Sequence, residues 1–254
     1  MSLEVRQFPC LSDNYGFLVH DTLSGETATI DTPEADRILG EADKAGWRIT
    51  QVWNTHWHPD HAGGNEAIVA ATGAQVIGPK EVSRIAPMPD TILSDGDIVH
   101  LGDHRAKVVD VGGHTLEHIA YVFEGQATAF VGDALFALGC GRLFEGTPQQ
   151  MWASLSRLKA LDPKTTIYCA HEYTAANAAF AQSVDSDNAA LAAYVDWVKE
   201  TRAQDLPTVP TRLDKELAAN PFLRADDPAM QSRMGAPGDP VKTFAELRAR
   251  KDTF

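Results

Sequence analysis

The stretch THWHPDH (residues 55–61) places three histidines and one aspartate in a single short segment. The apolar run ITQVWN (49–54) precedes it and the small residues AGGN (62–65) follow it, a pattern typical of a buried strand that ends in a loop. So many titratable groups would repel one another or lack hydrogen bonds if they were buried without a cation. Imidazole and carboxylate ligands together suit zinc, iron or manganese, so the stretch predicts a metal site.

The spacing within this stretch predicts two ions rather than one. Residues two apart on a strand point to the same side, so His56 and His58 can reach one ion while Trp57 turns into the packing. The proline that follows fixes the next turn, and Asp60 and His61 then project from a different direction toward a neighbouring ion.

Further ligands are expected where other apolar strands end in glycine or in a turn. His114 follows VVDVGG, Asp133 follows ATAFVG and His171 follows TIYCA. Taken singly, a histidine at a strand end is usually satisfied by a hydrogen bond, but the cluster at 55–61 favours ligation for all three. The predicted ligand sets are His56, His58 and His114 for one ion and Asp60, His61 and His171 for the other, with Asp133 between them.

The remaining histidines, His20, His100, His104 and His118, are expected to have ordinary structural roles. His118 lies near His114 in the sequence, and we expect it to support the site by hydrogen bonding rather than to bind a metal.

Composition narrows the class of protein. The chain has 254 residues, 44% of them hydrophobic, and a net charge of −13. This charge argues against a nucleic-acid partner and against attraction to anionic membranes. The three cysteines are too scattered for a disulfide framework, and the N-terminus shows no secretory signal. A reducing cytoplasm therefore fits best. We also expect the chain to be a monomer.

The composition and the predicted secondary structure of the chain change after about residue 172. Short strands separated by turns, with two clear helices, fill the first two-thirds, whereas the rest is rich in alanine and shows no strand pattern. Strands mixed with helices predict an α/β fold in which sheets lie between helices. We expect a catalytic domain at residues 1–172 and a smaller helical domain at 173–254.

The histidine stretch matches the THxHxDH signature of the metallo-β-lactamase superfamily, and GGHTLEHI, FVGDALF and YCAHEYT look like its remaining ligand motifs. Three further segments, LGCGRLFEGTPQQM, PTVPTRLDKELAANPFLR and the terminal RARKDTF, resemble the glyoxalase II (hydroxyacylglutathione hydrolase) family. The resemblance covers nearly the whole chain. It implies a metallo-β-lactamase-type αββα sandwich with a smaller C-terminal α-helical domain that helps to hold glutathione.

The resemblance also implies an activity. The expected reaction is hydrolysis of S-2-hydroxyacylglutathione thioesters, such as S-D-lactoylglutathione to glutathione and D-lactate, in methylglyoxal detoxification. The expected nucleophile is a hydroxide held by two divalent ions, first of all zinc, with iron or manganese as alternatives. Asp60 and Asp133 are the expected catalytic carboxylates.

Carried over by position, the residues expected to bind glutathione are Arg142, Phe144, Tyr173, Arg248 and Lys251. A lysine and a tyrosine commonly stand in the family where Arg142 and Phe144 stand here. Arginine keeps the charge and can bind a carboxylate with two hydrogen bonds. Phenylalanine has no hydroxyl, so one hydrogen bond to the tripeptide should be missing.

Other functions fit parts of the pattern. A glutathione persulfide dioxygenase with a single iron shares the metal motif, but the C-terminal segments favour the hydrolase. A non-catalytic binding module is disfavoured because every expected ligand position is filled. The acidic charge disfavours a nuclease, and a lactonase or β-lactamase leaves the C-terminal segments unexplained.

Overall fold

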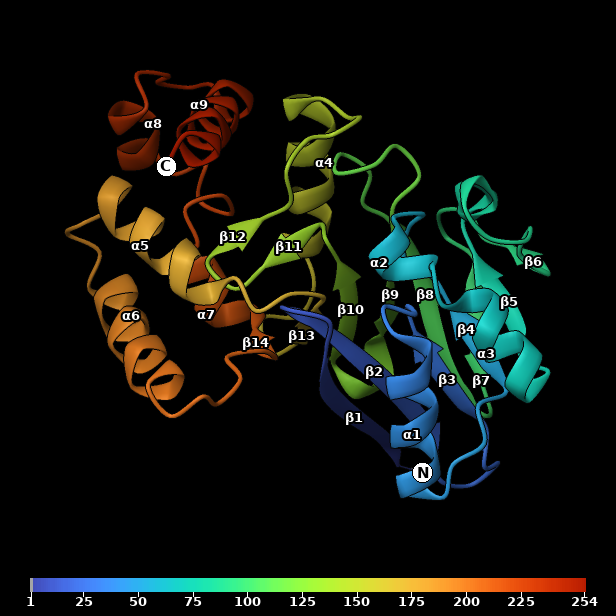
Figure 1. Ribbon diagram of the computed structural model, residues 1–254. Coiled ribbons are helices and arrows are strands. Elements are labelled where there is room, and N and C mark those ends of the chain that lie inside the picture. Colours follow the sequence, from blue (N-terminus) through green and yellow to red (C-terminus); the bar gives the residue numbers. More distant parts are fainter. Residues whose placement is uncertain (1) are drawn as a thin grey trace. The chain divides into compact units, whose positions relative to one another are not determined.

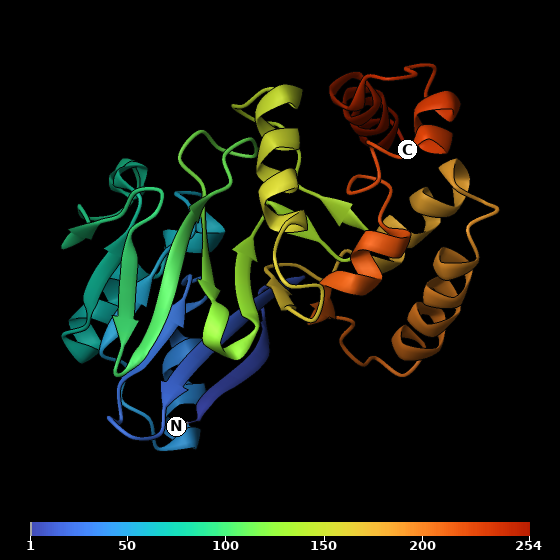
Figure 2. The same cartoon turned by 180° about the vertical axis from the view of Figure 1, so that it is seen from behind.

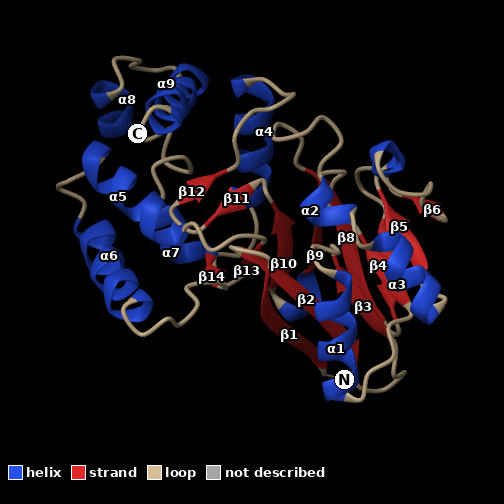
Figure 3. Ribbon diagram, in the orientation of Figure 1, coloured by secondary structure: helices blue, strands red, loops and turns tan. Residues whose placement is uncertain are grey.

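The computed structural model describes residues 2–254, which divide into two compact units. The first unit comprises residues 2–110 and Glu117–Gly132, and the second comprises Val111–Leu116 and Asp133–Phe254. Strands dominate the first unit and helices the second (Figures 1 and 3).

The first unit contains a six-stranded sheet in the order β1-β2-β3-β4-β5-β6. Strands β1 to β3 are joined by turns and pair antiparallel, whereas β3 to β6 pair parallel. The strands are β1 (Leu3–Cys10), β2 (Asn14–Asp21), β3 (Thr27–Ile30), β4 (Gln51–Trp53), β5 (Gln75–Gly78) and β6 (Thr91–Ile92). Helices α1 (Ala35–Ala45) and α3 (Asn65–Thr72) pack on this sheet, since Ile38 and Ile68 share one buried cluster with Leu18, Val52 and Val76.

A second sheet in the same unit is an antiparallel array. Its strands here are β7 (Ile98–Leu101), β8 (His104–Asp110), β9 (Ile119–Phe123) and β10 (Thr128–Gly132). They lie side by side in the green part of the ribbon in Figure 2. Aromatic rings join the two sheets: Trp53 lies 5.0 Å from Tyr121 and 5.8 Å from Phe123, between ring centroids. The core of the first unit is therefore apolar and aromatic, and it supports the strand ends that carry the site.

The second unit is mainly helical. Its helices are α4 (Pro148–Lys159), α5 (Thr174–Val184), α6 (Ala189–Arg202), α7 (Leu213–Ala219), α8 (Pro228–Arg233) and α9 (Pro240–Asp252). Helix α4 begins as the sequence predicts, with Thr147 as N-cap, Pro148 in the first turn and a capping box completed by Gln150. Buried residues of α5, α6 and α7 form a common cluster around Leu191 and Val195.

Short strands also occur in the second unit: β11 (Leu135–Phe136), β12 (Gly139–Cys140), β13 (Thr166–Cys169) and β14 (Thr211–Arg212). The expectation that no strand follows residue 172 is wrong for β14. Prolines at 207 and 210 keep this segment extended, and its main chain pairs with β13, with Thr166 opposite Arg212.

The first unit also contains three short helical segments. They are α2 (Pro59–Ala62) and the 3₁₀ helices η1 (Lys80–Arg84) and η2 (Glu124–Gln126). The domain boundary between residues 172 and 173 stays a prediction. None of the helices in residues 2–254 combines the length and the apolar run that a membrane span requires.

Candidate metal centre

The histidine stretch of the first unit lies where β4 ends and α2 begins. Pro59 is the first residue of α2 and His58 is its N-cap, so the strand turns directly into a short helix that carries Asp60 and His61. His56 and His61 are fully buried, whereas His58 and Asp60 are half-buried. The Nε2 atom of His56 lies 3.1 Å from the Nδ1 atom of His58.

Asp31, at the end of β3, orients two of these histidines. One of its carboxylate oxygens accepts a hydrogen bond from the Thr55 amide (2.7 Å), and the other accepts from the Thr55 hydroxyl (2.8 Å) and from His61 Nδ1 (2.8 Å). Because the Thr55 hydroxyl donates to Asp31, it can accept from His56 Nδ1 at 3.0 Å. Both Nδ1 atoms then carry the proton, so that the lone pair of each ring lies on Nε2, the atom that would bind a cation.

Two further contacts fix this cluster. The Asn14 side chain donates to Oδ2 of Asp60 at 3.1 Å, and the same oxygen lies 3.5 Å from His61 Nε2. The ring of His118 stacks on that of His56, with centroids 4.5 Å apart and planes 19° from parallel. His118 thus packs against a predicted ligand, and its expected hydrogen-bonding role stays a prediction.

Three predicted ligands come together in the second unit. Asp133 lies between two histidines: His114 Nε2 is 3.4 Å from its Oδ2, and His171 Nε2 is 3.3 Å from its Oδ1. All three are buried. His114 Nδ1 donates to the main-chain carbonyl of Arg142 at 2.8 Å, which leaves the His114 Nε2 lone pair on the side of the carboxylate.

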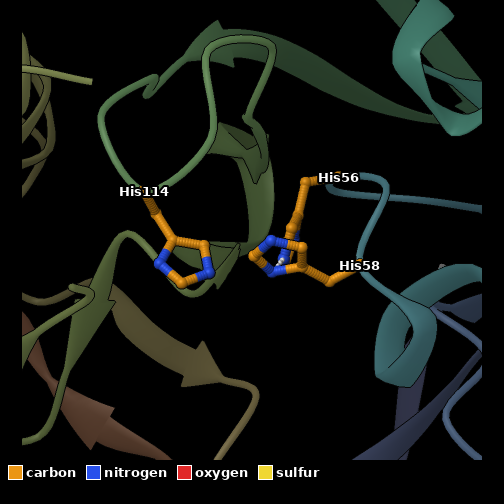
Figure 4. Close-up of side chains that lie close together, drawn as sticks. All are labelled: His56, His58 and His114. Carbon is orange, nitrogen blue, oxygen red and sulfur yellow. Dashed lines mark hydrogen bonds between the residues drawn. The ribbon is translucent and has the colours of Figure 1, made fainter. Parts of the chain in front are cut away.

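Three sets of side chains have ligand atoms that all lie within 4.8 Å of one another. They are His56, His58 and His114; His56, His61 and Asp133; and Asp60, His61 and His171. In Figure 4 the rings of His56, His58 and His114 point toward one another. The first and last sets are the ones that the sequence predicts for the two ions. That each of these residues binds an ion stays a prediction.

The chemistry of these groups fits a divalent cation. Imidazole nitrogens and carboxylate oxygens are the ligands that zinc, iron and manganese share, and the hydrogen bonds from Nδ1 of His56, His61 and His114 select the lone pairs that a cation needs. These groups support the binding of a divalent metal.

Three predicted glutathione contacts gather around Asp252, at the end of α9. Arg142 is exposed, with its Nε 3.9 Å from Asp252 Oδ1. Arg248 is buried and donates to Asp252 (2.8 Å from Nη2) and to the Cys140 carbonyl (3.0 Å from Nη1). Burial, followed by the positive charges of Arg248 and Arg142, lowers the pKa of Lys251. The cluster therefore combines three cations with one nearby anion.

The two predicted aromatic contacts lie beside predicted ligands. Tyr173 stacks on His171, with ring centroids 4.7 Å apart and planes 1° from parallel, and Phe144 meets His114 edge-on at 5.2 Å. Phe144 is 63% exposed and Tyr173 is 39% exposed, so both present ring surface to solvent.

Asp31 and Asn14 contact predicted ligands, and these two roles were not predicted from the sequence. Asp31 carries the same signal as the predicted ligands, because it ends an apolar strand, TATI, just before a turn. Asn14 opens β2 directly after a turn. Contact between these two residues and the predicted ligands depends on which strands are neighbours, and the sequence pattern does not specify that.

Comparison with known proteins identifies the family. Residues 16–171 match the family model of the metallo-beta-lactamase superfamily, and residues 172–254 match that of the hydroxyacylglutathione hydrolase C-terminus. A hydroxyacylglutathione hydrolase of Erythrobacter litoralis is 60% identical over 253 residues, which cover 99% of this chain and 100% of that protein. The chain belongs to the hydroxyacylglutathione hydrolase family. The predicted family and the prediction of a hydrolase are confirmed, and the dioxygenase alternative is not favoured.

Solved structures agree with this family in fold. ETHE1 from Myxococcus xanthus matches with a TM-score of 0.67 at 24% identity, covering 98% of this chain and 99% of that one. TTHA1623 in a di-iron-bound form matches with a TM-score of 0.58 at 25% identity, covering 66% of this chain and 91% of that one. The predicted fold class, a metallo-β-lactamase-type fold with a C-terminal helical domain, is confirmed.

Proposed function

We propose that this member of the hydroxyacylglutathione hydrolase family hydrolyses S-2-hydroxyacylglutathione thioesters, with S-D-lactoylglutathione as the leading substrate. The products are glutathione and a 2-hydroxy acid, D-lactate in this case, and the biological role is methylglyoxal detoxification. The observation that carries the proposal is the full-length identity of 60% to a protein named hydroxyacylglutathione hydrolase, which includes the C-terminal segment.

The site takes two divalent ions, with zinc as the first expectation and iron or manganese as alternatives. His56, His58 and His114 would hold one ion, Asp60, His61 and His171 would hold the other, and Asp133 would contribute its carboxylate between the two sets. The ligand sets of the described residues and the di-iron-bound form of TTHA1623 support this count. The chemistry that such ions supply is Lewis acidity toward the thioester carbonyl and a lowered pKa for water.

The protein side chains prepare the site for this reaction. Asp31 keeps the Nδ1 protons of His56 and His61 away from the ligand side. Asn14 holds the Asp60 carboxylate, which orients the attacking water. The leaving thiolate has a parent thiol with a pKa of about 8.5, so the reaction needs no strong general acid.

The second unit supplies the groups for glutathione. Arg142, Arg248 and Lys251 form a cationic cluster suited to the carboxylates of the tripeptide. Tyr173 and Phe144 present rings beside His171 and His114, where they line the thioester. Without a hydroxyl at position 144, one hydrogen bond to glutathione is absent. The chain works as a monomer in the cytoplasm, without a nucleic-acid or membrane partner.

The test combines an activity assay with elemental analysis of one purified preparation. S-D-lactoylglutathione is followed by the loss of thioester absorbance, and zinc, iron and manganese are counted per chain. We expect hydrolysis and close to two ions. His58→Ala and His171→Ala should each lower hydrolysis by about 100-fold or more and should reduce the metal content.

His100→Ala is the matched control, because this histidine is exposed and belongs to none of the ligand sets. It should keep full activity and full metal content. Full hydrolysis by a metal-stripped protein would refute the mechanism. Oxygen consumption with glutathione persulfide, in the absence of thioester cleavage, would instead restore the dioxygenase alternative.

A further inference from the structure

A two-residue turn in the second unit connects two parts of the proposed metal site. Strands β11 and β12 pair antiparallel and form a hairpin that turns at Ala137 and Leu138. The hairpin begins two residues after Asp133 and ends two residues before Arg142, whose carbonyl accepts the His114 Nδ1 proton at 2.8 Å. The position of this hairpin therefore affects both a ligand carboxylate and the group that orients a ligand imidazole.

The chain leaves the hairpin through a very tight passage. A Cβ atom on Gly141 would lie 2.0 Å from the Asp133 carbonyl oxygen and 3.1 Å from His114 Nδ1. Only glycine fits there, so a displacement of the hairpin would be transmitted directly to Asp133 and His114.

Two asparagine side chains, one in α5 and one at the C-cap of α7, bond to the hairpin main chain. Asn220 donates to the carbonyls of Phe136 (3.2 Å) and Gly139 (3.0 Å), and Asn177 donates to that of Ala137 (3.1 Å). The turn residue Leu138 is fully buried and has a φ of 58°, a left-handed conformation that a residue with a Cβ seldom adopts. Such a conformation persists only where the surroundings hold it in place.

Glu216, on α7, is the side chain that holds Leu138. Its Oε2 accepts from the Leu138 amide (2.8 Å) and from Asn220 Nδ2 (3.0 Å). Its Oε1 accepts from the hydroxyls of Tyr194 (2.9 Å) and Thr211 (2.7 Å).

The surroundings of Glu216 make it costly to bury. The residue has no exposed surface, and within residues 2–254 no lysine, arginine or histidine forms an ion pair with it. A buried carboxylate without a cation is expensive, and its pKa is raised by burial. Four hydrogen bonds offset part of this cost, and a carboxylate is the group that can accept all four at once.

We propose that Glu216 is a positioning residue of the hydrolase: by holding the Leu138 amide it fixes the β11–β12 hairpin, and through the hairpin it places Asp133 and the Arg142 carbonyl that orients His114. This inference rests on the proposed function, but the quantity that tests it is the affinity for zinc. It therefore remains testable if the substrate proves to be a different thioester.

The test compares substitutions at the two ends of the Glu216 network. Glu216→Met keeps a similar volume and removes every acceptor, so the Leu138 amide loses its partner. We expect zinc affinity, measured by competition with a chelating dye, to fall by about tenfold or more, and kcat to fall by a similar factor. The visible spectrum of the Co²⁺-loaded protein should change as well, because the ligand geometry is altered.

Glu216→Gln is the conservative partner. Its amide oxygen can still accept from Leu138, and its NH₂ group can face the two hydroxyls, which can rotate to accept. Zinc affinity and kcat should stay within about threefold of the unsubstituted protein. The loss of a group that orients a metal ligand typically lowers affinity or activity by about 10–100-fold. Tyr194→Phe is the stability control, since it removes a donor to Oε1 and leaves the Leu138 bond in place.

Two results would overturn the proposal. The first is a folded Glu216→Met protein whose zinc affinity, Co²⁺ spectrum and kcat match the unsubstituted protein. The second is a Tyr194→Phe protein that loses as much zinc affinity as Glu216→Met, because the effect would then follow stability alone. If Glu216→Met does not fold, Glu216→Asp decides: the shorter carboxylate should lower zinc affinity, and a folded protein with unchanged zinc affinity and kcat refutes the inference.

Discussion

Two buried carboxylates support the site in different ways. Asp31, in the first unit, bonds directly to His61 and reaches His56 through the Thr55 hydroxyl. Glu216, in the second unit, touches no predicted ligand and bonds to the main chain at Leu138. The first carboxylate orients imidazole rings, whereas the second fixes the path of the backbone.

The difference follows from how each group of ligands is spaced along the chain. The predicted ligands of the first unit lie within residues 56–61, so the local backbone already brings them together and only the orientation of their side chains remains to be set. The predicted ligands of the second unit stand at 114, 133 and 171 and meet only after folding. There the backbone itself must be held, and main-chain groups such as the Arg142 carbonyl orient the ring.

The largest effect is expected at Asp31. Asp31→Asn keeps the size of the side chain, and asparagine tolerates the left-handed φ of 58° at this position. It removes the charge that favours the Nδ1 protons of His61 and, through Thr55, of His56. Zinc affinity should fall by about 100-fold, which chelator competition measures.

Asp21→Asn provides the control for this change. Asp21 is as buried as Asp31, but it accepts from the amides of Leu23 and Ser24 in the turn after β2. The substitution should lower stability without changing zinc affinity. Equal losses of zinc affinity in the two variants would remove the distinction between orientation of the rings and general stability.

The second prediction concerns the backbone at Gly141, directly after the β11–β12 hairpin. Gly141→Ala places a methyl group where the Asp133 carbonyl oxygen would be 2.0 Å away, so the main chain must move. We expect the free energy of unfolding to fall by about 1–3 kcal/mol, together with a loss of hydrolysis. Gly125→Ala, where no atom lies within 4 Å of the added Cβ, should leave hydrolysis unchanged. Full hydrolysis by Gly141→Ala would show that the passage can relax freely.

The sequence predicts which side chains could bind a metal, but it does not predict which residues orient them. The seven predicted ligand positions show a local signal, either the dense cluster at 55–61 or a polar residue at the end of an apolar strand. The role of Asp31 depends on the parallel pairing of β3 with β4, where Ile30 lies opposite Trp53. A local pattern does not specify which strands become neighbours, so this role could not be predicted.

Other elements were hidden by their length or by their polarity. Helix α2 has four residues, too few to show a helical period. The segment LDKEL around Glu216 contains three charged residues and reads as a solvent-exposed helix start, yet Glu216 is fully buried. Tertiary contacts decide its burial, and they outweigh the usual preference of glutamate for the surface.

Glu41 is a third buried carboxylate, and unlike Glu216 it is surrounded by cations. Lys44 Nζ lies 2.8 Å from it, and Arg6 Nη2 lies 2.9 Å from it. The hydrogen bond from Lys44 is the main cause that lowers the pKa of Glu41 from its usual 4.5, against the opposing effect of burial. Glu41→Gln should therefore lower the free energy of unfolding by about 1–2 kcal/mol at pH 7, because its cations are partly exposed.

The effect of Glu41→Gln on the free energy of unfolding should depend on pH. A lowered pKa stabilises the folded state above the unfolded value of 4.5, and this stabilisation is lost as the pH falls through the folded value. Urea denaturation should show a gap between the two proteins at pH 7 that narrows below pH 4.5. For Glu216 the raised pKa has the opposite sign, so its contribution declines as the pH rises. A gap for Glu41→Gln that widens in acid would contradict the lowered pKa.

The smallest effect is expected at Tyr194, on the far side of the Glu216 carboxylate. Tyr194→Phe removes a hydroxyl that donates to Glu216 Oε1 at 2.9 Å, while the ring of this α6 residue keeps its buried position. The free energy of unfolding should fall by about 1 kcal/mol, as for the loss of one buried hydrogen bond. Zinc affinity should not change, because Oε2 still accepts from Leu138. Thr211→Val removes the other hydroxyl that donates to Oε1 and should behave in the same way. The bonds to Oε1 would then contribute to stability alone, whereas the bond from the Leu138 amide to Oε2 would position the metal site.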